Sequence, residues 1–377
     1  MSRRVQLAAL GASSAETEEL LAYNENLFDL GALGPESRFP LPDEPFVPFW
    51  QEVAEEARTH GAFAALRERL PQFRFPIREG ISETEPYRAA TRRGAPVDGM
   101  PEATGLEVGQ PEAIEVVIHS SLAGRIPLLI ARGREEFVAL LRALTKKNEP
   151  EPVPDAQGAL MVSGYNNWCR ISGLRRLWEA QDLEERETAT WAEEFQRIQG
   201  QRDLYQDRFI LLSNGPYSAV PAADLGLKDS EWREMSLVIR REHECAHYFT
   251  RRLFGSMRNN VLDELIADYA GLTAATGRFR ADWFLRFVGL EEFPRYRPGA
   301  RLDLYRGKPL LSDGAFRVLQ ALLKAAAEML ERFPPEEMSV MIPALASLRL
   351  EDLAGEDGER ALSGAVRDLR QRLAGDR

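Results

Sequence analysis

The chain has 377 residues, of which 44% are apolar and 28% are charged, and its formal net charge at pH 7 is −11. This length leaves room for about two domains of a globular protein, and the composition excludes the disordered and fibrous classes. The negative charge argues against partners with an anionic surface, so neither nucleic acid nor a membrane is expected as a partner.

The sequence predicts a cytoplasmic protein. No run approaches the ~20 apolar residues that would span a bilayer, and two cysteines, Cys169 and Cys245, do not make a disulfide framework. The first 15 residues faintly resemble a signal peptide. However, Ser13 and Glu16 have the spacing of a capping box, so we expect a folded helix and a retained N terminus.

The first 150 residues predict a mixed α/β region whose role the sequence does not indicate. Apolar periodicity separates helices from strands here, and prolines and glycines mark the loops between them. Residues 77–112 have no periodicity and are expected to be loop. The predicted helices cover 14–29, 51–70 and 134–147, the predicted strands 114–119 and 126–131, and a further loop 39–50.

Residues 148–158 are rich in proline and are the best candidate for a linker between two domains, 1–150 and 151–377. Beyond the linker, a small sheet is expected to precede a helical bundle, which makes the fold class α+β. The predicted strands cover 159–164 and 208–213, with a helix over 183–200 between them. The later predicted helices cover 229–254, 261–275, 281–289, 313–333, 335–347 and 358–374.

The helix predicted over 229–254 contains the pentapeptide HECAH, which holds two of the four histidines in the chain. On a helix His243 and His247 lie ~40° apart around the axis, and both imidazoles can reach one zinc ion at ~2.0–2.1 Å. Glu244 lies ~60° further round, where its carboxylate can take a proton from a metal-activated water. The pattern therefore predicts a catalytic zinc site.

Zinc needs a third protein ligand, and the next helix offers two carboxylates. Gly255 suits a helix end and Asn260 a helix start, so the second helix should fold back beside the first. We compare how far each side chain lies from the turn between the two helices, measured along the helix axis at ~1.5 Å per residue. This distance slightly favours Asp268 as the ligand, because Asp268 and His247 lie at about the same distance from the turn. The longer side chain of Glu264 can bridge the difference, and Asp268 would then accept a hydrogen bond from a ligating histidine.

The motif HECAH followed by ELIAD resembles the gluzincin class of zinc metallopeptidases, in which HExxH precedes a downstream glutamate ligand. The resemblance covers residues 235–275. It implies a zincin-like domain over 151–377 that ends in a helical bundle. It also implies that substrate lies along an edge strand before the active helix, for which residues 208–213 are the candidate.

The resemblance assigns roles to five side chains. It implies that Zn2+ is bound by His243, His247 and Glu264. It further implies that Glu244 is the general base and that Asp268 orients a ligating imidazole.

Other candidate residues have a simpler structural explanation. Cys245 projects toward the core side of its helix and is expected to be a small buried hydrophobe. His60 and His119 are expected to be structural. Tyr217 and Tyr165 are the candidate donors to a developing oxyanion, although packing in turns is the expected role of both.

Two functions follow from these patterns. The first is zinc-dependent hydrolysis of a peptide bond in a peptide or protein substrate, carried out by a metal-activated water with Glu244 as the base. The alternative is a non-enzymatic binding or regulatory protein on a metallopeptidase-like scaffold. The sequence carries no signal for an oligomeric state.

Overall fold

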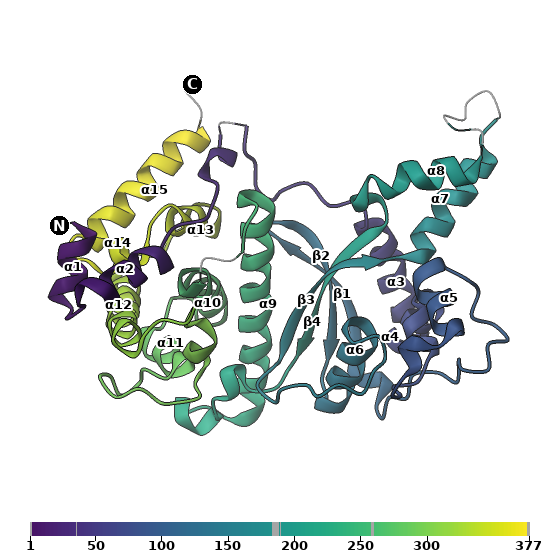
Figure 1. Cartoon of the computed structure of the whole chain (residues 1–377), viewed down its shortest axis with the longest axis horizontal. Helices are drawn as coiled ribbons and strands as arrows, with labels where there is room; N and C mark the ends of the chain where they lie inside the picture. The colour runs from purple at the N-terminus through teal and green to yellow at the C-terminus, as the bar shows by residue number, and fades with distance from the viewer. Residues whose placement is uncertain (1, 35, 183–187, 189, 258–259, 375–377) are drawn as a thin grey trace. The chain divides into compact units, whose positions relative to one another are not determined.

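The computed structural model describes residues 2–34, 36–182, 188, 190–257 and 260–374 (Figure 1). The fold class is α+β, as predicted, and the chain forms two compact units. The first unit is built mainly of helices and comprises Met1–Leu41, Ser121–Ala123 and Pro216–Arg377. The second unit contains the sheet and comprises Pro42–Ser120 and Gly124–Gly215.

The second unit is organised around a four-stranded mixed sheet with the strand order β1-β2-β4-β3. β2 and β4 are parallel, and Leu128 lies opposite Ile210; β3 and β4 are antiparallel. Runs of branched and apolar residues favour these strands, as the sequence predicted. Their bounds are β1 (Ile114–Ser121), β2 (Gly124–Ala131), β3 (Ala159–Asn166) and β4 (Gln206–Ser213).

The strand predicted over 208–213 is present as part of β4, but its predicted place at the edge of the sheet is wrong. β4 pairs with β2 on one side and with β3 on the other, so both of its backbone edges are engaged. All residues from Phe209 to Ser213 are buried, as expected for an interior strand. A strand in this position has no free edge to which a substrate strand could add.

The helices of the second unit differ from the prediction in four places. α3 begins at Val47, inside the stretch 39–50 that was predicted to be loop. α5 lies inside the stretch 77–112 that was predicted to be loop, and α7 was not predicted. The helix predicted over 51–70 is divided at Gly61, which has a φ of 86°. Of the helix predicted over 183–200, residues 183–187 and 189 lie outside the described residues. The helices are α3 (Val47–His60), α4 (Ala62–Arg69), α5 (Glu85–Arg93), α6 (Arg134–Thr145), α7 (Trp168–Ala180) and α8 (Trp191–Gln199).

The first unit contains the helices that the sequence predicted after residue 229. The capping box of Ser13 and Glu16 is also present at the start of α2. Among the described residues, none of the helices combines the length and the apolar character needed to cross a bilayer. The α-helices are α1 (Arg3–Ala9), α2 (Ser14–Tyr23), α9 (Asp229–Phe254), α10 (Asn260–Thr276), α11 (Ala281–Val288), α12 (Asp313–Arg332), α13 (Met338–Ala346), α14 (Leu350–Ala354) and α15 (Gly358–Ala374).

The boundary predicted between residues 150 and 151 does not coincide with the division into units. Residues 148–158 connect α6 to β3, and both elements belong to the second unit. β4 follows this segment and pairs with β2, which precedes it. Strand pairing therefore holds both sides of the proline-rich segment in one unit, while the N-terminal 41 residues belong to the unit that contains α9 and α10.

The close approach of α9 and α10 positions the candidate site, and Gly271 permits it (Figure 1). A Cβ atom at Gly271 would lie only 2.6 Å from the carbonyl oxygen of Ile239 on α9. Backbone atoms cannot yield as a flexible side chain can, so the spacing of the two helices depends on this glycine.

Replacing Gly271 by alanine should therefore force α9 and α10 apart. We expect a loss of about 1–3 kcal/mol in the free energy of unfolding, typical of an overpacked core, measured by urea or thermal denaturation. The control is Gly364→Ala in α15, where the nearest atom, Nη2 of Arg367, would be 3.9 Å from the added Cβ. That variant should be as stable as the parent or more so, and an equally stable Gly271→Ala protein would contradict the argument.

Candidate metal centre

α9 holds the two histidines of the HECAH motif in buried positions. The helix runs without interruption from Asp229 and ends at Gly255, whose φ of 69° closes the last turn in the left-handed conformation. His243 and His247 are 7% and 5% exposed. Buried imidazoles require polar partners, so their surroundings decide what these residues can do.

The structure brings His243 and His247 together with Glu264 of α10. The Nε2 atoms of the two imidazoles are 3.1 Å apart. Each Nε2 also lies 3.5 Å from a carboxylate oxygen of Glu264. One nitrogen from each histidine and one oxygen from Glu264 all lie within 4.8 Å of one another, close enough to share one metal ion.

The outer nitrogen of each imidazole faces a buried aspartate. Nδ1 of His243 lies 2.8 Å from Oδ1 of Asp268, and Nδ1 of His247 lies 3.2 Å from Oδ2 of Asp263. At His243 this contact is a hydrogen bond, which holds the proton on Nδ1 and leaves the lone pair on Nε2. At His247 the carboxylate is within ion-pair distance of Nδ1 but makes no hydrogen bond to it, so only the attraction between the charges favours a proton there. Two such lone pairs facing each other at 3.1 Å repel unless a proton or a cation lies between them.

This donor set fits a divalent metal ion such as zinc. Two imidazole nitrogens and one carboxylate oxygen are a common ligand set of catalytic zinc, and they leave a position for water or substrate. The sequence left open whether Glu264 or Asp268 would be the third ligand. Only Glu264 points its carboxylate at both Nε2 atoms, because Asp268 lies behind His243.

A chain of hydrogen bonds fixes the proton on His243. Arg301 comes from a short 3₁₀ helix, η8 (Arg301–Tyr305), and its Nη1 donates to the hydroxyl oxygen of Tyr217 at 2.8 Å. The hydroxyl of Tyr217 donates in turn to Asp268 at 2.5 Å, and Arg301 also forms an ion pair with Asp268. Asp268 therefore only accepts, which makes Nδ1 of His243 the donor.

The position of Tyr217 excludes one of its predicted roles. Its hydroxyl lies 3.0 Å from Nδ1 of His243, on the opposite side of the ring from Nε2. A donor placed there supports the histidine and does not face the position of a reacting carbonyl. Tyr165, the other predicted donor, belongs to the second unit and donates its hydroxyl to Gln72 at 2.7 Å.

The charges of the site favour a bound cation. Burial opposes ionisation of Glu264, but the neighbouring His247 and His243 outweigh burial and lower the pKa of this carboxyl to about 2. Burial also opposes ionisation of Asp268, and the guanidinium of Arg301 outweighs it and keeps the pKa of Asp268 far below its ordinary value. Burial favours neutral His247, yet Asp263 and Glu264 raise the pKa of His247 well above its ordinary value. The ionised carboxylates of Glu264 and Asp268 thus face the imidazoles.

Glu244 follows His243 directly and is half-buried. Within the part of the chain that the structure describes, its carboxylate makes no hydrogen bond or ion pair. Glu244 thus follows a candidate metal ligand in the sequence and has no hydrogen-bond or ion-pair partner among these residues, as a proton acceptor requires.

Three residues around the site were not predicted from the sequence: Asp263, Arg301 and Tyr305. Asp263 is next to Glu264, and the pair of adjacent acidic residues was a usable signal. Arg301 lies 33 residues after Asp268 and is brought to it only by the tertiary fold. Tyr305 is near enough to Glu264 for that carboxylate, together with burial, to raise the pKa of its phenol.

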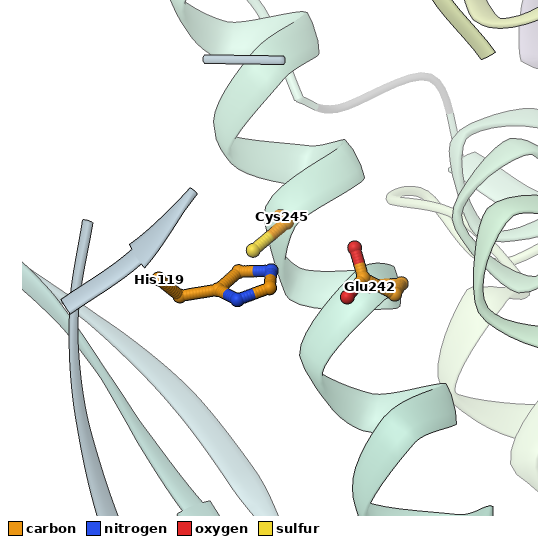
Figure 2. Close-up of side chains that lie close together, drawn as sticks. All are labelled: His119, Glu242 and Cys245. Atoms are coloured by element: carbon orange, nitrogen blue, oxygen red, sulfur yellow. The ribbon is translucent and has the colours of Figure 1, made fainter. Parts of the chain in front are cut away.

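The remaining predicted residues do not contribute atoms to this set of three converging side chains. Figure 2 shows Glu242 and Cys245 on α9; His119, drawn with them, comes from β1. Cys245 is 4% exposed, which confirms the prediction of a small buried residue. His60 is exposed in the last turn of α3, in the second unit.

Comparison with known proteins places the chain in a family without assigning it a function. The chain belongs to a family of unknown function (DUF7005), which matches residues 5–357 and therefore includes parts of both units. No curated protein and no solved structure matches the chain.

The pairing of Arg301 with Asp268 gives a test of the site's construction. Arg301→Met would leave the fully buried carboxylate of Asp268 without its cation, and the side chain of Arg301 is only 14% exposed. We expect a loss of about 3–5 kcal/mol in the free energy of unfolding, measured by denaturant titration.

Two further variants control this experiment. Arg295→Met removes a guanidinium that is 82% exposed and paired with Glu292, so it should cost less than about 1 kcal/mol. Adding Asp268→Asn to Arg301→Met should restore part of the lost stability, because the unpaired charge is removed. Equal stabilities of the Arg301→Met and Arg295→Met proteins would show that the buried pair is unimportant.

Proposed function

We propose that the protein is a zinc-dependent hydrolase, and most specifically a metallopeptidase. The observation that carries the proposal is the convergence of His243, His247 and Glu264, whose ligand atoms lie within 4.8 Å of one another. The aspartates that face Nδ1 of each imidazole, Asp268 and Asp263, also support the proposal. Both histidines direct Nε2 toward the same carboxylate, which is the arrangement that a shared metal ion needs and that a chance cluster of polar residues would rarely adopt.

His243, His247 and Glu264 would hold the metal ion. When bound there, zinc supplies a Lewis acid that polarises a carbonyl group and makes water acidic enough to react near neutral pH. Asp268 keeps the proton of His243 on Nδ1 through a hydrogen bond, so that Nε2 of His243 stays available. Asp263, within ion-pair distance of Nδ1 of His247, favours the same arrangement there by its charge. Arg301 and Tyr217 hold Asp268 in place.

Glu244 would move the proton. Its carboxylate accepts a proton from the attacking water and then passes it to the leaving nitrogen of the peptide bond. The absence of a hydrogen bond or ion pair to Glu244 within the described residues supports this role, because no neighbouring group competes for the carboxylate.

The choice of a peptide as the substrate rests on the resemblance of HECAH and ELIAD to the gluzincin metallopeptidases. A peptide or protein substrate and a cytoplasmic location both follow from the sequence and are part of this proposal. A binding protein that had lost the metal site would purify without stoichiometric zinc, and one that had kept the site is separated from a hydrolase by turnover.

Metal binding can be tested with the four histidines of the chain. The parent protein, purified without chelator, should contain one zinc per chain by elemental mass spectrometry, and His247→Ala should lose most of it. His60→Ala removes a histidine from the second unit and should keep the full zinc content. Equal zinc in the His247→Ala and His60→Ala proteins would exclude the proposed centre.

Turnover can be tested by replacing Glu244 with glutamine. Glu244→Gln should retain zinc and lose hydrolysis of casein or a peptide library by about 10²-fold or more, because the proton acceptor is gone. Glu231→Gln, an exposed position on the same helix, should leave the rate unchanged. A Glu244→Gln protein as active as its parent would rule out Glu244 as the base. Zinc binding by a parent protein that hydrolyses none of these substrates would favour the binding function.

A further inference from the structure

The N-terminal 41 residues are part of the first unit, the unit that contains the candidate metal centre. They are joined to it by contacts between residues far apart in the sequence. The side-chain amide of Asn26 donates to the carbonyl of Ala346 at 2.6 Å, and Arg3 pairs with Glu351 at 2.9 Å. The carboxylate of Glu19 accepts from the backbone N–H of Ser312 at 2.8 Å. This segment is therefore built into the helical unit.

Tyr23, the last residue of α2, contacts both elements that support the metal centre. Its buried hydroxyl donates to the carbonyl oxygen of Tyr305 at 2.5 Å and accepts from the backbone N–H of Val261 at 3.3 Å. Its own carbonyl oxygen accepts from the side-chain amide of Asn260 at 2.7 Å. The ring is also enclosed, since a Cβ atom at Gly307 would lie 2.9 Å from it.

The two partners of this hydroxyl lie one helical turn from residues of the site. Val261 is in the first turn of α10, three residues before Glu264. Tyr305 is in η8, which begins with Arg301, the partner of Asp268. The N–H of Val261 is one of the first donors of α10 and has no partner within its own helix. Tyr23 satisfies this donor and the carbonyl of Tyr305 with one hydroxyl group.

We propose that Tyr23 is a positioning residue of the metal centre. Its hydroxyl fixes the start of α10 relative to η8, and so keeps Glu264 and the Asp268–Arg301 pair at the depth of the two histidines. The inference rests on the proposed zinc site. It makes the N-terminal segment part of the support of that site.

The test removes only the hydroxyl, by Tyr23→Phe in the full-length protein. Zinc affinity is measured by competition with a chromophoric chelator, and thermal unfolding is followed with and without zinc. We expect the dissociation constant for zinc to rise about tenfold, as for residues that orient metal ligands. The increase in Tm on adding zinc should shrink correspondingly.

Tyr87→Phe is the matched control. Tyr87 is also a buried tyrosine, and its hydroxyl donates to Asn148 at 3.0 Å, in the second unit. Both variants should lower the Tm of the zinc-free protein, but Tyr87→Phe should bind zinc as tightly as the parent. A purely structural role for Tyr23 would make the two variants alike.

The outcomes distinguish this inference from the proposed function. If the parent protein binds no zinc, the proposed function fails, and this inference fails with it. If the parent binds zinc and Tyr23→Phe binds it within about twofold of the parent, outside the range expected for an orienting residue, only the role of Tyr23 is overturned. A weaker affinity confined to Tyr23→Phe supports the proposal.

Discussion

The structure of the first unit depends on balancing negative charge in its interior. Asp263 and Asp268 are 2% and 0% exposed, and Glu264 lies beside them on the same helix. Removing carboxylates from water is costly unless each one has a cation or several donors as partners. Arg301 and the two histidines meet this need in part, and a divalent ion between the imidazoles would complete it. The close packing of α9 against α10 brings the histidines to these carboxylates, and η8 brings Arg301 to Asp268.

The part of the site that the sequence predicts is the part with short-range causes. His243 and His247 are one helical turn apart, and a connection of a few residues returns α10 to them, so periodicity and helix ends were sufficient to bring the two helices together. The choice of Glu264 over Asp268 came from the resemblance to the gluzincins. Arg301 approaches Asp268 through a chain segment without periodicity, and Tyr23 reaches Val261 from the other end of the sequence. No local pattern encodes such contacts.

Contacts between distant parts of the chain also explain where the predicted fold was wrong. The apolar sequence of β4 indicated a strand, but its neighbours are fixed by pairing with β2, far back in the chain, and with β3. The prolines of 148–158 indicated an extended segment, yet an extended segment within a sheet-containing unit has the same composition as a linker between units. Local composition predicts the conformation of a segment, but it does not predict whether the elements on either side belong to one unit or to two.

The first unit is built from segments that are far apart in the sequence, and this has a consequence for synthesis on the ribosome. Residues 42–120 and 124–215 form the second unit and emerge before α9, α10 and η8. Because units generally fold in the order in which they are made, the second unit can fold early, whereas Tyr23 must wait for partners encoded more than two hundred residues later. The residues of the candidate metal centre and the side chains that support them therefore come together only after residue 305 has left the ribosome.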